Sequence, residues 1–264
     1  MRVQTFNPMN LAYDSANDYR RGSHNLMSML SDTVEKIVTA NRILAREEVV
    51  DGFGHVSMRH PTDPERYLLS RSRSPELVQS GDILEYTLDG TCIDDKGGMK
   101  PYAERFIHGA IYKARPDVMS VVHHHAYPVV SFTASKMPIR PMMHTTAVIG
   151  HEIPLWDIRD KFGPNTNMLV VNMEQGGDLA KKLGNNRMVM MRGHGATSAG
   201  TTIEDSVISS IYLQIAARQQ LDALTIGGEI TYLSKGEIDG QISPEVIAIA
   251  FPRIWEYFSR RAGR

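Results

Sequence analysis

Residues 123–125 are three consecutive histidines, and they end an apolar run, residues 117–124, that predicts a β-strand. Side chains alternate between the two faces of a strand, so His123 and His125 point the same way and His124 points to the opposite face. The two imidazoles on the shared face would lie about 6–7 Å apart along the strand, within reach of one metal ion. The pattern therefore predicts a strand that presents two metal ligands on one face.

A third histidine, His194, follows another apolar run and stands between two glycines. Two histidines on one strand face and a third from a distant segment are typical of catalytic metal sites, where three protein ligands leave positions open for water or substrate. A lone histidine is more often an ordinary hydrogen-bonded residue, which is our interpretation of His24, His60 and His151. We therefore predict one divalent metal ion per subunit, and three imidazoles would accept zinc, manganese, cobalt or iron.

Residues 102–115 predict a helix that stops before Pro116, because the residue preceding a proline disfavours the helical conformation. Glu104 and His108 lie four positions apart and therefore share one face of this helix. Either the two form a pair on the helix surface, or the surrounding apolar residues bury that face. In the second case burial near a metal would move the carboxyl pKa toward neutrality, and Glu104 could act as a general acid or base.

An arginine-rich loop and a glycine-flanked turn are candidates for substrate binding. Arg71 and Arg73 lie in a Ser-Arg-Ser-Arg-Ser loop, which is either a solvated basic loop or a pair of guanidinium groups for a carboxylate or phosphate. The segment from Gly54 to Ser57 offers backbone N–H groups and a hydroxyl, which suit an anion or a ring hydroxyl. The predicted substrate contacts are Arg71, Arg73, His55, Ser57, Ser70, His144 and Tyr212.

The composition excludes several classes of function. A net charge of −1 gives no basic surface for nucleic acid or anionic lipid, and no apolar run reaches the length of a membrane span. The single cysteine rules out a cysteine-based zinc site, so histidines and carboxylates must hold any metal. The N-terminus lacks the apolar segment of a signal peptide, and we therefore expect a cytoplasmic protein.

The 264 residues are expected to form one α/β domain with a meandering sheet. Residues 1–24 would form an N-terminal arm, irregular up to residue 22, that packs on a neighbour, and residues 229–264 a C-terminal extension. Thr201 and Glu204 would cap the last long helix at its start. Helices are predicted over residues 25–46, 102–115, 177–183 and 203–224, and strands over residues 49–59, 66–70, 82–90, 117–124 and 187–191.

Several motifs, in a consistent order, carry a resemblance to a known family. They are Gly54-His-Val-Ser57-x-Arg59, Leu77-Val-x-x-Gly81-Asp82-Ile-Leu-x-Tyr-x-Leu-Asp89-Gly90, Glu104-Arg-Phe-Ile-His108-Gly-Ala-Ile-Tyr112-Lys-Ala-Arg115-Pro116-Asp117, Val121-Val-His123-x-His125-Ala and Gly193-His194-Gly195. Over about residues 30–225 the chain resembles the class II aldolase/adducin family.

This resemblance implies a three-layer α/β/α fold around a mainly antiparallel central sheet. It also implies a homotetramer with active sites at the subunit interfaces. By motif match, a divalent metal would be held by His123, His125 and His194. The helix glutamate of the family, its acid/base, corresponds to Glu104.

Departures from the family pattern bear on the substrate, a small carboxylate. Sugar-phosphate aldolases of the family typically carry Gly-Asn in the turn and Ser-Ser before the glutamate, whereas this chain has His55 and Tyr102-Ala103. The chain instead looks like the branch of hydroxylated aromatic or pyridine dicarboxylate decarboxylases, such as 3,4-dihydroxyphthalate decarboxylases. That branch implies a metal-dependent carbon–carbon lyase that decarboxylates a hydroxylated aromatic or heteroaromatic (di)carboxylate through a metal-stabilised enolate.

Three alternatives remain open at this point. The first is a retro-aldol lyase that acts on a hydroxy-keto acid with the same metal site. The second is a non-haem iron oxygenase built on the same fold, since three histidines could hold Fe(II). The third is a non-catalytic, adducin-like interaction module, against which the histidine triad and Glu104 argue.

Overall fold

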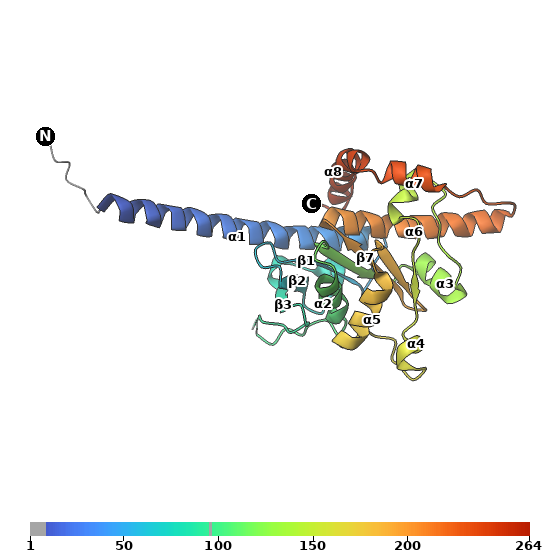
Figure 1. Ribbon diagram of the computed structural model, residues 1–264, viewed down its shortest axis with the longest axis horizontal. Coiled ribbons are helices and arrows are strands. Elements are labelled where there is room, and N and C mark those ends of the chain that lie inside the picture. The colour runs from blue at the N-terminus through green and yellow to red at the C-terminus, as the bar shows by residue number, and fades with distance from the viewer. Residues whose placement is uncertain (1–8, 95–96) are drawn as a thin grey trace.

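The computed structural model describes residues 9–94 and 97–264, with helices on both faces of a central sheet (Figure 1). In that part of the chain, seven strands form one sheet in the order β3-β2-β1-β4-β7-β6-β5. All neighbouring strands are antiparallel except β5 and β6. The strands are β1 (His55–Arg59), β2 (Arg66–Ser70), β3 (Ile83–Thr87), β4 (Ser120–His124), β5 (Leu155–Trp156), β6 (Met188–Met191) and β7 (Gly195–Gly200).

The helices form two layers around this sheet. One face packs against α2 and α5, and the other packs against α1, α6, α3 and α8. The three-layer α/β/α arrangement with a mainly antiparallel sheet is thus confirmed. The helices are α1 (Met9–Arg46), α2 (Arg105–Ala114), α3 (Tyr127–Ser135), α4 (Arg159–Phe162), α5 (Met173–Leu183), α6 (Ile203–Ile226), α7 (Lys235–Gln241) and α8 (Pro244–Arg261).

Strand β4 lies at the centre of the sheet, and all five of its residues are buried. Val121 packs into the cluster under α2 and α5, while Val122 packs into the cluster under α1 and α6. Because strand residues alternate faces, His123 follows Val121 toward α2, and His124 follows Val122 toward the opposite layer. The alternation of the histidines is therefore fixed by apolar burial on both sides of the same strand.

Strand β7 begins at a glycine for a steric reason. β7 pairs with β4 so that Ala196 lies opposite His124. A Cβ on Gly195 would overlap the carbonyl oxygen of His124. The absence of a side chain at Gly195 lets the start of β7, and with it the preceding turn, approach the end of β4.

Two predicted details at the helix starts are wrong. Helix α1 begins at Met9, so residues 9–22 are helical and not irregular, whereas residues 1–8 of the predicted arm lie outside the described residues. The N-terminal part of α1 extends beyond the rest of the molecule (Figure 1). The cap of α6 is Thr202, not Thr201, because the Thr202 hydroxyl accepts a hydrogen bond from the Asp205 N–H at 3.1 Å.

The C-terminal segment packs on the domain through α7 and α8. Phe258 of α8 belongs to the core cluster beneath α1, and Phe251 belongs to the cluster around α3 and α6. Among the described residues, every helix is too short or too polar to cross a membrane.

Candidate metal centre

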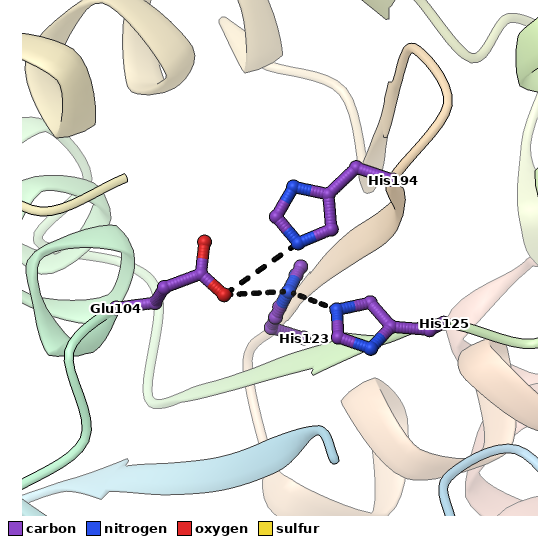
Figure 2. Close-up of side chains that lie close together, drawn as sticks. All are labelled: Glu104, His123, His125 and His194. Atoms are coloured by element: carbon purple, nitrogen blue, oxygen red, sulfur yellow. Dashed lines mark hydrogen bonds and ion pairs between the residues drawn. The ribbon is translucent and has the colours of Figure 1, made fainter. Parts of the chain in front are cut away.

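Four side chains from three separate segments converge on one point (Figure 2). Glu104, His123, His125 and His194 each offer a ligand atom, and these atoms lie within 4.8 Å of one another. The Nε2 atoms of His123 and His125 are 3.0 Å apart. The Oε2 atom of Glu104 lies 3.6 Å from His123 Nε2 and 3.5 Å from His194 Nε2. The three predicted ligands and the predicted acid/base are thus brought together.

Each of these side chains sits where an element begins or ends. His123 is near the end of β4, and His125 directly follows that strand. His194 lies in the turn between β6 and β7, which Gly193 completes with a positive φ of 59°. Glu104 directly precedes α2, at the N-cap position, and its side chain makes no capping hydrogen bond. The pairing of β4 with β7 and the packing of α2 on the sheet therefore assemble the cluster.

His123 is oriented so that a ring nitrogen without a proton can face the cluster. His123 Nδ1 lies 3.2 Å from the hydroxyl of Thr197, which stands opposite it on β7. With the proton on Nδ1 and donated to Thr197, the Nε2 lone pair of His123 faces the cluster. Burial, reinforced by the neighbouring His125 and His194, holds the pKa of His123 well below its usual value. Burial likewise lowers the pKa of His125.

Converging imidazole nitrogens are the donor set of a divalent transition metal. Glu104 is oriented toward the same point, because its Oε1 accepts a hydrogen bond from the Val170 N–H at 3.0 Å and its Oε2 is left facing the histidines. The residues present therefore fit a metal ion with three histidine ligands and a carboxylate beside it.

A cavity of about 380 Å³ opens over this cluster. Its size suits a substrate with a single ring. The ring of Phe53 lies 6.4 Å from that of His125, and the ring of Tyr102 lies 4.6 Å from that of His55, so aromatic walls flank the polar base. The lining residues are Gly52, Phe53, Gly54, His55, Ser72, Arg73, Ser74, Tyr102, Ala103, Glu104, His125 and Leu169.

The two loop arginines are held by a buried carboxylate that the sequence did not single out as functional. Arg71 Nε binds Asp82 Oδ1 at 2.6 Å, and Arg73 binds Asp82 Oδ2 at 2.7 Å. Burial alone would raise the pKa of Asp82, but hydrogen bonds from Arg71, the Gln79 N–H and Arg73 outweigh it and lower the pKa. Two guanidinium groups against one carboxylate leave one net positive charge at the rim of the cavity.

His108 does not face the metal ligands but takes part in a buried hydrogen-bonded chain. Its Nε2 lies 2.6 Å from His55 Nδ1, and its Nδ1 lies 2.6 Å from the Ser57 hydroxyl. Ser57 in turn contacts the Tyr112 hydroxyl at 2.7 Å. Burial lowers the pKa of His108 to about 3, so the ring is neutral.

The predicted substrate contacts divide into three groups. Of the predicted residues, His55 and Arg73 line the cavity, while Arg71, Ser57 and Ser70 lie behind them and are partly or fully buried. His144 and Tyr212 do not line it. His144 is exposed at the start of a 3₁₀ helix (His144–Ile149), and Tyr212 of α6 packs against the core cluster around α3.

Comparisons with known proteins agree with this geometry. The family described as Class II Aldolase and Adducin N-terminal domain matches residues 35–221, and the chain belongs to this family. The chain is 30% identical over 248 residues to decarboxylase tropJ of Talaromyces stipitatus, covering 86% of this chain and 92% of that protein.

Two further similarities concern a bacterial enzyme and a solved fold. The chain is 29% identical to the 3,4-dihydroxyphthalate decarboxylase of Arthrobacter keyseri, over 77% of this chain and 84% of that protein. The fold matches the L-fuculose 1-phosphate aldolase of Glaciozyma antarctica PI12 with a TM-score of 0.75 and 21% identity, covering 90% of this chain and 92% of that one. The resemblance drawn from the motifs, including its decarboxylase branch, is confirmed.

Proposed function

We propose that this protein is a divalent-metal-dependent carbon–carbon lyase that decarboxylates a hydroxylated aromatic or heteroaromatic carboxylate. The observation that carries the proposal is the cluster of Glu104, His123, His125 and His194 at the base of a ring-sized cavity with an arginine at its rim. The similarity to two decarboxylases over most of the chain supports it.

Loss of CO2 from the keto form of the ring sends the electron pair of the broken carbon–carbon bond through the ring to the neighbouring oxygen. When bound by the three histidines, a divalent ion would supply a Lewis acid that stabilises negative charge on a neighbouring oxygen, an effect of several kcal/mol. Aromatic side chains in the cavity wall would reduce the contact of a bound ring with water, which would strengthen such electrostatic stabilisation.

Arg73 would bind and orient the substrate. It lines the cavity, and its side chain is 27% exposed, so the guanidinium nitrogens not engaged by Asp82 can reach a substrate carboxylate. Arg71, paired with the same carboxylate, adds positive charge from behind. Because Asp82 fixes both side chains, little conformational entropy is lost when the substrate binds.

Glu104 would move the proton. Its Oε2 faces the histidine cluster, while the hydrogen bond from Val170 to Oε1 holds the carboxyl group in place. In the proposed reaction Glu104 accepts the proton of the ring hydroxyl and delivers it to the ring carbon that bears the carboxylate, which gives the keto form of the ring. The bond between that carbon and its carboxylate then breaks, CO2 leaves, and the electron pair restores the aromatic ring with the negative charge on the former hydroxyl oxygen, so charge and protons balance.

For the assembly, we propose a homotetramer with active sites at the subunit interfaces. Support comes from large apolar side chains left exposed on two helices, which are Leu26, Met27, Met29 and Leu30 on α1 and Leu221, Leu224 and Ile226 on α6. Multi-angle light scattering on the purified protein would give the number of subunits, and a monomer would contradict this part of the proposal.

The reaction is tested with metal analysis followed by a substrate panel. The panel contains hydroxylated phthalates and hydroxylated pyridine dicarboxylates, each matched with the parent dicarboxylate that lacks the hydroxyl. We expect CO2 release only from members with a hydroxyl next to a carboxylate, and only while the protein holds its metal. An aldehyde product would instead favour retro-aldol cleavage, and oxygen uptake would favour an oxygenase.

A further inference from the structure

A chain of four buried hydrogen-bonding side chains runs from the protein interior to the cavity. The Tyr112 hydroxyl lies 2.7 Å from the Ser57 hydroxyl, which lies 2.6 Å from His108 Nδ1. His108 Nε2 lies 2.6 Å from His55 Nδ1, and His55 lines the cavity above the metal ligands. All four side chains are at least 97% buried, so water cannot replace a missing partner.

The inner end of the chain determines the direction of every hydrogen bond in it. The Tyr112 oxygen receives a hydrogen bond from the backbone N–H of Val121, and among the described residues Ser57 is the acceptor within reach of its proton. Its proton must therefore be donated to the Ser57 oxygen, because a buried hydroxyl proton without an acceptor is strongly disfavoured. Ser57 then donates to His108 Nδ1.

The outer end of the chain follows from the inner end. His108 accepts at Nδ1 and must carry its proton on Nε2, which donates to His55 Nδ1. Two N–H groups cannot face each other at 2.6 Å, so His55 Nδ1 is unprotonated. The neutral His55 ring therefore carries its proton on Nε2. The opposite direction would leave the Tyr112 proton buried without an acceptor.

The Nε2 atom of His55 has no hydrogen-bond partner in the part of the chain that the structure describes. We propose that Tyr112, Ser57 and His108 hold His55 in the tautomer that presents a neutral Nε2–H donor to the cavity. Its partner is an acceptor oxygen of the substrate, and a carboxylate is the strongest acceptor of the class named above. This role of His55 rests on the proposed function, from which the class of substrate is taken.

His55 is therefore a specificity residue that touches substrate, and the other three are positioning residues. The arrangement explains how a ring close to the metal ligands can bind an anion without becoming charged itself. A second positive charge beside His123 would oppose a metal cation, whereas a neutral N–H donor does not.

The tautomer is tested directly by NMR on zinc-loaded protein labelled with ¹⁵N-histidine, without substrate. The His55 signals are assigned by their absence in His55→Gln. We expect proton correlations at Nε2 and an unprotonated Nδ1. In Ser57→Ala, where His108 Nδ1 loses its donor, we expect His55 to show a mixture of tautomers or the opposite one, and Tyr112→Phe should shift the balance in the same direction. A wild-type His55 protonated at Nδ1 would overturn the proposal.

Binding is tested by calorimetry with two probes, phthalate, which has two carboxylates, and catechol, which has two hydroxyls and no carboxylate. His55→Phe removes the N–H donor, and His55→Gln keeps one. We expect His55→Phe to weaken phthalate binding about tenfold or more, and His55→Gln to stay within about threefold. Catechol binding and zinc content should be unchanged in both variants.

Equal phthalate affinity in His55→Phe and the wild type would contradict the donor role. An equal loss for phthalate and catechol would do so as well, because it would indicate a distorted cavity. Neither measurement depends on turnover, so a failed screen for CO2 release would leave this test intact, and a failure here would leave the decarboxylase proposal intact.

Discussion

The base and the rim of the cavity are built in different ways. At the base, His123 is fully buried and Glu104 is 7% exposed, and both are placed by the sheet and the helix packed on it. At the rim, the side chains of Arg71 and Arg73 are 32% and 27% exposed, and a loop carries them. Phe53, also at the rim, is 70% exposed.

This difference in burial between the bottom and the rim of the cavity reflects two ways of holding side chains in place. Strand register holds the base, since His123 pairs with His55 on one side and Thr197 on the other. Ion pairs to one buried carboxylate, Asp82, hold the rim. Changes at the bottom of the cavity should therefore impair metal binding, chemistry or both, whereas changes at the rim should mainly alter substrate affinity. Predictions can separate these effects.

The largest effect is expected for His123→Ala. Loss of one of three imidazole ligands should release the metal and reduce the decarboxylation rate by about a thousandfold or more, because several kcal/mol of Lewis-acid stabilisation is lost. Elemental analysis of the purified variant measures the metal, and a CO2 assay measures the rate.

The neighbouring histidine provides the matched control. His124 points to the opposite face of β4, where its Nδ1 accepts a hydrogen bond from the Ala126 N–H. His124→Ala should lower the melting temperature but retain a full complement of metal. Full metal content in His123→Ala would contradict the ligand assignment, as would loss of metal from both variants while both remain folded.

The second effect concerns proton transfer by Glu104 at the bottom of the cavity. Glu104→Gln keeps an oxygen that can accept the hydrogen bond from Val170 but cannot accept a proton. We expect the metal to stay bound while kcat falls by about 10²–10⁴-fold with little change in KM. Glu174→Gln, on the exposed surface of α5, is the control and should behave as the wild type. A near-normal kcat in Glu104→Gln would exclude the proposed role.

The sequence was most informative where a residue's role depends on local spacing. Two histidines two apart on an apolar strand must share a face, and this alone predicted how His123, His124 and His125 are oriented. The same reasoning found β2 and most of α2 and α6. The spacing also suggested that His194 and Glu104 belong to the same site, and motif similarity then gave the two residues their specific roles as metal ligand and acid/base.

Features that depend on distant contacts were missed. β7 has the sequence Gly-Ala-Thr-Ser-Ala-Gly, whose small residues show no apolar alternation, and it is a strand because it fits between β4 and β6. Asp82 gave no sign of its role, since its pairing with Arg71 and Arg73 requires the fold of the loop. The contact of Thr197 with His123 likewise exists only through the register of two strands.

The third effect tests whether the hydrogen bond between Thr197 of β7 and His123 contributes to metal affinity. Thr197→Val removes the acceptor for the His123 Nδ1–H while preserving the shape of the side chain. Metal affinity should fall by about 10–100-fold, as is typical when a hydrogen bond to a metal-ligating histidine is lost. Thr197→Ser keeps the hydroxyl and should retain wild-type affinity. Competition with a chromophoric chelator measures both, and equal affinities for the Val and Ser variants would rule out the contribution of Thr197.

The smallest effect concerns the rim, where two arginines share one carboxylate but only Arg73 lines the cavity. Arg71→Ala and Arg73→Ala each remove one ion pair with Asp82, so any general loss of loop order is common to both. Direct contact with the substrate carboxylate belongs to Arg73 alone, and we expect KM to rise about tenfold in Arg73→Ala and only a few-fold in Arg71→Ala, with kcat little changed in either. Steady-state kinetics on the same dicarboxylate measures the difference between the variants. Equal increases in KM would mean that the rim acts through its charge and order rather than through one contact, and a large fall in kcat would mean that the rim and the base are not separate in function.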